Sequence, residues 1–141
     1  MELRIKRTDG APVPKYAKPG DAGLDLTTRK RVTLAPGETA TVPTGIAAAI
    51  PEGCVGLCFP RSGLASKLGI NLANCVGVID SGYRGEIMAP LHNISHDVVT
   101  IDVGERVFQL VIMPYISAQI VEVDELDETE RGSDGFGSTG V

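Results

Sequence analysis

Side chains that could bind an anion or activate water gather in five short, glycine-containing segments of the chain. These segments are residues 21–26, 60–65, 77–87, 104–110 and 131–140. Each places an acid or an arginine near glycine, whose missing side chain lets backbone amides approach a ligand closely. Because guanidinium and backbone N–H groups are common partners of phosphate oxygens, the pattern indicates a site for a small phosphorylated molecule.

The third segment places an acid at the end of an apolar stretch. Asp80 follows Val78 and Ile79 and is followed by Ser81-Gly82, so its carboxylate is expected to project from a strand end into a pocket. A carboxylate there can take a proton from a water molecule that attacks phosphorus. These residues alone leave open an alternative, in which Asp80 closes a hairpin as an Asx turn.

The second segment puts an arginine and a hydroxyl where a strand meets a short helix. The unpaired amides at the start of a helix would favour an anion beside Arg61 and Ser62. The alternative is that Ser62 only caps the helix and Arg61 is a surface charge. Both readings stay open on these residues.

The last segment formally matches the dinucleotide-binding pattern G-x-G-x-x-G at residues 135–140. That pattern requires a strand before it and a helix after it, whereas here an acidic stretch precedes it. A glycine-rich segment can still wrap its amides around phosphates, with Arg131, Ser138 and Thr139 as further donors and Phe136 stacking on a base. A solvated tail is the alternative.

Together, the five segments resemble the motif set of the trimeric dUTP pyrophosphatases (dUTPases). The resemblance extends from Asp21 to Gly140 with order and spacing intact, and departs at Asp134, where the family more often has glycine. It implies a Mg²⁺-dependent hydrolase in which water, activated by Asp80, attacks the α-phosphorus of dUTP to give dUMP and pyrophosphate. Such an enzyme would limit uracil incorporation into DNA and supply dUMP for dTMP synthesis.

The resemblance also implies a role for each candidate residue. Tyr83 would stack on the deoxyribose and leave no room for a 2′-hydroxyl, and Asp25 would meet Mg²⁺ through water while the phosphates hold the ion. The remaining substrate-binding candidates are Arg61, Ser62 and Gly63 for the α- and β-phosphates, Gln109 for the α-phosphate, Asn74, Val76 and Gly77 for uracil, and Arg131, Phe136, Gly137 and Ser138 on the C-terminal arm.

Two of these residues, and Arg106 in the fourth segment, keep a plain structural alternative. Residues 70–77 predict two strands joined by a turn, and the backbone of this turn could pair with uracil. Asn74 lies in the turn, and the alternative is that it is an ordinary turn residue without contact to a base. Asp25 lies between two leucines, as a solvated outward-facing acid also would. Arg106 is interpreted as a structural ion-pair partner in preference to a phosphate ligand.

Many short strands must position these segments. Alternating apolar residues bounded by Gly, Pro, Asn or Asp predict roughly ten strands, in runs at Leu3/Ile5, Val32/Leu34, Val55/Leu57/Phe59, Ile70/Leu72, 98–101 and 107–112. The expected fold is all-β, a jelly-roll-like barrel or sandwich. Only residues 62–68 predict a helix, with Ser62 as its N-cap and Gly69 as its end.

One domain is expected. Residues 1–123 would form the β-barrel, and residues 124–141 would be an acidic linker and a mobile, glycine-rich arm of the same domain. Because such an arm can cross to a neighbour, and the family is trimeric, we expect a homotrimer with shared active sites.

Composition argues against some classes of binding partner. A net charge of -5 argues against a general nucleic-acid binder, and the apolar runs are too short to cross a bilayer. The N-terminus has no apolar signal core, so a cytoplasmic location is expected. Three cysteines cannot all pair and are expected to be buried small hydrophobes, while His92 and His96 are expected in loops without a metal role.

Two other functions fit part of the pattern. A dCTP deaminase would have related architecture, but its chains are longer and lack this combination of Gly-Phe-Gly tail and Asp-Ser-Gly-Tyr segment. A regulatory β-trimer could bind dUTP and signal to a partner. The presence of Asp80 favours the hydrolase over a pure sensor.

Overall fold

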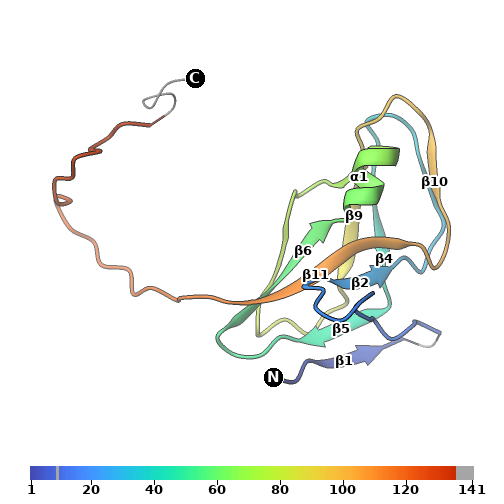
Figure 1. The fold of residues 1–141 in the computed structure, drawn as a ribbon, viewed down its shortest axis with the longest axis horizontal. Coiled ribbons are helices and arrows are strands. Elements are labelled where there is room, and N and C mark those ends of the chain that lie inside the picture. The colour runs from blue at the N-terminus through green and yellow to red at the C-terminus, as the bar shows by residue number, and fades with distance from the viewer. Residues whose placement is uncertain (9, 136–141) are drawn as a thin grey trace.

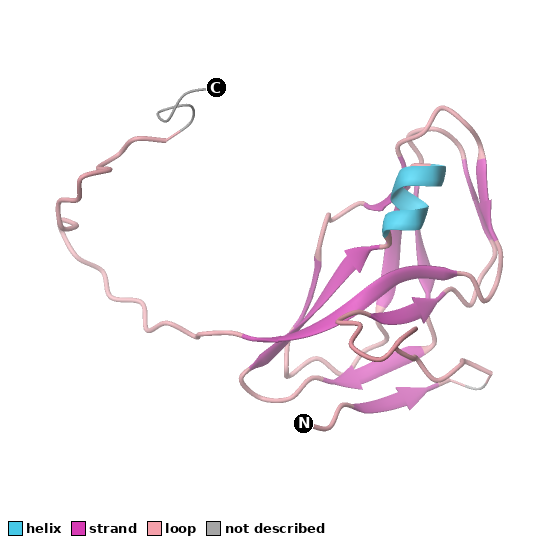
Figure 2. Cartoon of the chain, in the orientation of Figure 1, coloured by secondary structure: helices cyan, strands magenta, loops and turns pink. Residues whose placement is uncertain are grey.

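The structure, a computed structural model, describes residues 1–8 and 10–135 (Figures 1 and 2). The described residues form one helix and eleven short strands, so the expected all-β class is confirmed. The elements are β1 (Arg4–Arg7), β2 (Leu24–Thr27), β3 (Val32–Leu34), β4 (Thr39–Pro43), β5 (Ile46–Ala49), β6 (Cys54–Pro60), α1 (Ser62–Leu68), β7 (Ile70–Leu72), β8 (Gly77–Ile79), β9 (Met88–Asn93), β10 (Val99–Ile101) and β11 (Arg106–Pro114).

The strands form four antiparallel sheets. The largest has the order β2-β11-β6-β8, and a second has the order β4-β9-β7. Two pairs, β1-β5 and β10-β3, complete the set among the described residues. Within residues 1–8 and 10–135 no sheet closes on itself, so the fold is an open, jelly-roll type of packing. The core lies among buried side chains that include Leu26, Leu34, Ile70, Leu91 and Phe108.

β11 is the strand on which the largest sheet depends. It pairs with β2 on one side and β6 on the other. Its pairing with β2 contains a bulge: Arg106 lies opposite Thr27 and Phe108 opposite Leu26, so Val107 has no partner. Val107 and Phe108 are both buried. The bulge therefore shifts the alternation of inward and outward side chains along the rest of the strand.

The helix begins at Ser62, the residue that was expected to cap it. Ser62 is already helical, and Arg61 is the N-cap, with extended backbone angles and no side-chain cap. The prediction of Ser62 as N-cap is therefore wrong, because the turn of the helix has started before its hydroxyl could face the first free amides. Gly69 ends the helix at φ 64°, as predicted, in a left-handed conformation that glycine adopts freely.

Two other expectations need correction. Cys54 and Cys58 are buried as expected, but the expectation is wrong for Cys75, which is exposed because it lies in the turn between β7 and β8, with φ at 61°. All three thiols are free. His92 lies on β9 and not in a loop, with Nδ1 at 2.8 Å from Thr39 Oγ1 of the paired strand β4. His96 does lie outside the strands, as expected.

After β11 the chain leaves the body as an extended segment (Figure 1). Tyr115 N–H donates to Gly53 O at 3.1 Å, and no later described residue is hydrogen-bonded to the body. Residues 115–135 are exposed. Arg131 lies within this segment, whereas Phe136, Gly137 and Ser138 lie outside the described residues. In the described part of the chain, no helix is long and apolar enough for a membrane span.

Candidate active site

One group of candidate residues lies in register across three neighbouring strands. Gln109 on β11 pairs with Asp25 on β2 and with Phe59 on β6. Paired residues point to the same face of a sheet, so the three side chains form a row. Leu24 and Leu26 are buried on either side of Asp25. The alternation of the strand therefore turns Asp25 away from the core.

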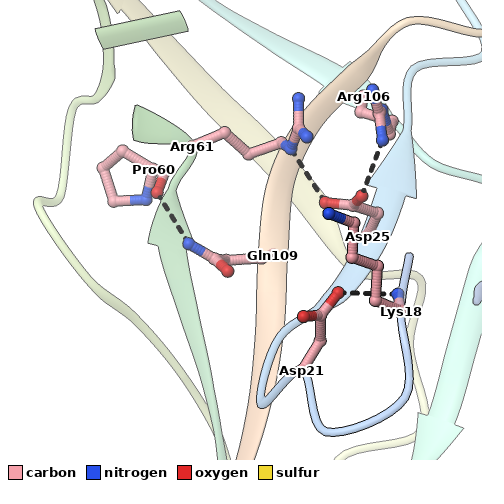
Figure 3. Close-up of polar contacts among 7 residues, drawn as sticks. All are labelled: Lys18, Asp21, Asp25, Pro60, Arg61, Arg106 and Gln109. Atoms are coloured by element: carbon pink, nitrogen blue, oxygen red, sulfur yellow. Dashed lines mark hydrogen bonds and ion pairs between the residues drawn. The ribbon is translucent and has the colours of Figure 1, made fainter. Parts of the chain in front are cut away.

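Asp25 holds two arginines beside this row (Figure 3). Its carboxylate accepts a hydrogen bond from Arg61 Nε at 2.8 Å and one from Arg106 Nη1 at 3.2 Å. The Asp25 side chain is only 15% exposed. The interpretation of Arg106 as an ion-pair partner is thus confirmed. Arg61 and Arg106 keep guanidinium N–H groups that are not bonded to Asp25, and such groups can donate to an anionic ligand.

A cavity of about 350 Å³, here called the Asp25 cavity, opens beside the row. Gln109 lies in it and donates through Nε2 to Pro60 O at 3.2 Å, which fixes the direction of its amide (Figure 3). Asp21 also lines it, and accepts from the Lys18 N–H at 2.8 Å. The lining residues are Ala17, Asp21, Ala22, Gly23, Asp25, Phe59, Arg61, Ser62, Gln109 and Val111.

Gly23 is required for the position of Gln109. A β-carbon on Gly23 would lie at 3.0 Å from both Cβ and Cδ of Gln109, and closer still to its Oε1. The amide of Gln109 therefore rests directly against the Gly23 backbone. No role was predicted for Gly23, although its place in the first glycine-containing segment was the signal that could have suggested one.

Asp80 lies in a different cavity. It follows β8, is exposed, and lines a groove of about 260 Å³, here called the Asp80 groove, with Cys54, Val55, Val78, Ser81 and Tyr115. These residues meet because β6 pairs with both β8 and β11, so the end of β8 and the end of β11 flank its start. The carboxylate of Asp80 makes no hydrogen bond or ion pair with another described residue, and stays free to bind a water molecule.

Tyr83 is held close to Asp80 by its own loop. Its N–H donates to Asp80 O at 3.1 Å, and its hydroxyl donates to Glu86 O at 3.0 Å. The carboxylate of Glu86 accepts from the Gly45 N–H at 2.6 Å, which ties this loop to the β4–β5 turn. A β-carbon on Gly85 would lie at 2.6 Å from Tyr83 Cζ, so only glycine leaves room for the ring.

The turn expected to bind a base is present between β7 and β8. Asn74, Cys75 and Val76 lie in it, with Cys75 N–H donating to Leu72 O at 2.9 Å. The flanking strands do not pair with each other: β7 pairs with β9 and β8 with β6. Gly77 allows the close approach of β8, because a β-carbon there would lie at 3.1 Å from Cys58 Cβ.

The structure thus brings together only part of the predicted site. The Asp25 cavity contains Asp25, Arg61, Ser62 and Gln109, whereas Asp80 and Tyr83 are not among its lining residues. Gly63 is exposed on α1, and Arg131 donates only to Asp134 O within the extended segment. Tyr115 beside Asp80 was missed, and no local sequence signal marks it, because it reaches the groove through strand pairing.

The acidic groups fit Mg²⁺ only in one way. Among the described residues, no three His, Cys, Asp or Glu side chains gather closely enough to hold a metal ion. Both carboxylate oxygens of Asp25 already accept from arginines. Such a donor set fits a hydrated ion that a substrate's phosphates carry, with Asp25 facing its water molecules, because Mg²⁺ readily keeps several waters.

Known proteins resemble the chain over almost its whole length. The dUTPase family model matches residues 9–140. The deoxyuridine 5'-triphosphate nucleotidohydrolase of Cutibacterium acnes is 52% identical over 130 residues, covering 92% of this chain and 86% of the relative. The enzyme of the same name from Finegoldia magna is 46% identical over 142 residues, covering 99% of each chain.

Solved structures agree with the sequence comparisons. The dUTPase of Staphylococcus bacteriophage 80alpha with dUPNHPP has a TM-score of 0.90 and 32% sequence identity to this chain, covering 99% of both. The phage φ11 dUTPase of S. aureus has a TM-score of 0.82 at 27% identity. The motif segments, the fold and these relatives lead to one conclusion: the chain belongs to the dUTPase family.

Proposed function

We propose that the protein hydrolyses dUTP to dUMP and pyrophosphate through attack of water on the α-phosphorus. Asp80 is the general base that takes the proton of that water. Membership of the family and the names of its relatives support the substrate and the bond that is cleaved. In the cytoplasm, this reaction would limit uracil incorporation into DNA and supply dUMP for dTMP synthesis.

The Asp25 cavity binds the triphosphate. Arg61 uses Nε for Asp25, which fixes the plane of its guanidinium and leaves the Nη groups to donate to phosphate oxygens. Ser62 and Gly63, at the start of α1, add backbone N–H groups, and the Gln109 amide is directed toward the α-phosphate. These groups stabilise charge mainly by being held in place before the reaction.

The other end of the nucleotide is bound by the β7–β8 turn and the Tyr83 loop. Backbone groups of Asn74, Val76 and Gly77 read the edge of uracil, and an unpaired group would disfavour cytosine by about 1 to 3 kcal/mol. The ring of Tyr83 lies under the deoxyribose and excludes a 2′-hydroxyl. Bound Mg²⁺ would neutralise phosphate charge, with Asp25 facing its waters.

One observation carries the proposal of a shared site: Asp80 and the phosphate-binding residues line different cavities of one chain. Hydrolysis requires both around one phosphorus atom. A homotrimer resolves this if the Asp25 cavity of one copy faces the Asp80 groove of the next. The arm of a third copy, with Arg131, Phe136, Gly137 and Ser138, would close over the nucleotide and exclude water.

The substrate is tested by measuring pyrophosphate release from a panel of deoxynucleoside and ribonucleoside triphosphates, with and without Mg²⁺. We expect dUTP to exceed dCTP, dTTP and UTP in kcat/KM and the rate to depend on Mg²⁺. Deamination of dCTP, followed as loss of its cytosine absorbance, would favour the deaminase. Tight dUTP binding without pyrophosphate release would favour a sensor.

The shared site is tested by subunit mixing. Asp80→Asn and Arg61→Gln chains, each inactive alone, are unfolded together and refolded. If the two residues serve one site from different copies, each mixed trimer owns one intact site, and equal mixing restores about a quarter of the parental activity. Mixed trimers that form by mass measurement but stay inactive would place both residues in one chain's site.

A further inference from the structure

A groove lined by three cations shares no lining residue with either cavity. It has a volume of about 430 Å³, and Arg4, Lys6 and Arg84 line it together with Ile5 and Ala47–Ala49. We call it the basic groove. Arg4 and Lys6 are two residues apart on β1, so they project from the same face of that strand. The alanines belong to β5, which pairs with β1, and supply an apolar floor.

The charges of this groove are uncompensated within the described part of the chain. No carboxylate lines the groove, and the ion pairs among described residues involve none of its three cations. Arg84 is held in place by donating from Nη1 to Ser81 O at 2.6 Å and to Tyr83 O at 2.7 Å. Its remaining guanidinium N–H groups can face a ligand.

An acidic segment of the same chain has the opposite composition. Residues 124–130 carry five carboxylates, those of Asp124, Glu125, Asp127, Glu128 and Glu130. Every residue of this segment is exposed, and none forms an ion pair with a described residue. Leu126, 86% exposed, adds an apolar side chain among the acids. Acids interspersed with an apolar side chain match a groove with a basic rim and an apolar floor.

The path of the chain makes a neighbouring copy the natural partner. Beyond Tyr115 the segment leaves its own body, on which β1 and β5 lie (Figure 1). We propose that residues 124–130 of one copy dock in the basic groove of another copy. A single exposed ion pair contributes little. Several pairs formed within one assembly act together, because the assembly keeps the segment at high effective concentration.

This contact is separate from the chemistry of the proposed function. None of the three groove cations is assigned to substrate binding or catalysis. The contact would decide the direction in which each arm travels before it reaches any nucleotide. It can therefore fail while dUTP hydrolysis stands, and it can hold in a protein that hydrolyses nothing.

The experiment is zero-length crosslinking of the full-length protein without nucleotide. Unlabelled and ¹⁵N-labelled chains are refolded together and treated with a carbodiimide, which activates a carboxylate so that Lys6 Nζ attacks it and forms an amide. We expect an adduct between the Lys6 peptide and the peptide of residues 124–130, with one labelled and one unlabelled half. Lys6→Arg, which keeps the charge but not the amine, should abolish this adduct, and Lys18→Arg should leave it unchanged.

The electrostatic basis is tested by neutralising the other two cations. The double variant Arg4→Gln, Arg84→Gln should lower the adduct yield at least about fivefold, and so should raising salt from about 50 mM to about 500 mM. The control Lys30→Gln, Arg31→Gln removes the same charge from the segment between β2 and β3, which does not line the groove, and should change the yield less than about twofold. An adduct only within single chains, no Lys6 adduct, or equal losses in both double variants would overturn the proposal.

Discussion

The two cavities of one chain are built in opposite ways. The Asp25 cavity rests on three paired strands, and its charged residues hold one another through half-buried ion pairs. The Asp80 groove lies at strand ends, and its acid is exposed without a partner among described residues. Under the proposed function, a single chain would provide the anion-binding surface, and another copy would cover the exposed Asp80.

This difference has a physical reason. Binding a polyanion needs donors fixed in advance, because ordering them on arrival would cost free energy at each encounter. A general base needs access to water and substrate, and an ion pair would lower its ability to take a proton. The following predictions test whether the Asp25 cavity binds phosphate while the Asp80 groove provides the general base.

The largest effect is expected from the reactive acid itself. Asp80→Asn removes the basic oxygen at almost unchanged volume, so turnover should fall by about a hundredfold or more while dUTP binding and thermal stability remain. Stopped-flow turnover and calorimetric binding measure the two separately. Asp102→Asn, an exposed acid paired with Arg31, is the control and should behave as the parent. Near-parental turnover by Asp80→Asn would mean that another group is the base.

A smaller effect is expected from the backbone that supports the phosphate side. In Gly23→Ala the new methyl would displace the Gln109 amide, and we expect kcat/KM for dUTP to fall about tenfold through this overpacking. Gly82→Ala is the matched control, since nothing lies within 4 Å of its β-carbon. If both variants keep parental kcat/KM, the row of Asp25, Gln109 and Phe59 is less rigid than its geometry indicates.

The sugar side should respond with a change of selectivity. Gly85→Ala pushes the ring of Tyr83 from its place, so it should act like Tyr83→Ala and relax discrimination against UTP more than against dCTP. We expect the ratio of kcat/KM for dUTP to that for UTP to fall by about threefold to tenfold. The Gly82→Ala control lies in the same loop. If selectivity over UTP and selectivity over dCTP fall equally, Tyr83 does not recognise the sugar separately from the base.

The smallest effect concerns β6, the strand that contributes lining residues to both cavities. Burial raises the pKa of Cys58 from its ordinary 9.0 to about 12. The unfolded thiol ionises first as pH rises, so this group's contribution to stability is complete below about pH 9 and is lost between about pH 9 and pH 12. Urea unfolding should show about 1 kcal/mol of this loss between about pH 8 and pH 10. Cys58→Ala should lack it, whereas exposed Cys75→Ala should keep it.

Much of the fold could be predicted from alternation along the sequence. The runs at Leu3, Val32, Val55, Ile70, 98–101 and 107–112 all correspond to strands, and the one helix has the predicted bounds. Alternation does not show which strand pairs with which. β2 and β11 pair across about 80 residues, and β7 and β8 join different sheets despite being neighbours.

The candidate site was predictable as a set of residues but not as an arrangement. Arg61 and Gln109 were chosen by motif, and their shared cavity follows from the pairing of β6 with β11, which no local pattern reveals. The predictions of Ser62 as the N-cap and of His92 in a loop were wrong. Each depends on where a helix or strand begins or ends to within about one residue, which the sequence pattern does not fix. Whether Asp80 meets Arg61 remains a prediction about more than one chain.

The unpaired residue in β11 has a consequence for how this protein tolerates change. Replacing Val107 by another apolar residue alters only local packing. Deleting it would restore an unbroken ladder in which Phe108 stays opposite Leu26 and Gln109 stays opposite Asp25, so core and site would keep their faces. Deleting Gln109 instead would place an apolar residue opposite Asp25. A deletion library through residues 106–110 should therefore retain active members at Val107, less stable by the loss of one buried side chain, and lose activity at Gln109. The bulge gives this strand one residue that it can lose without a change of register.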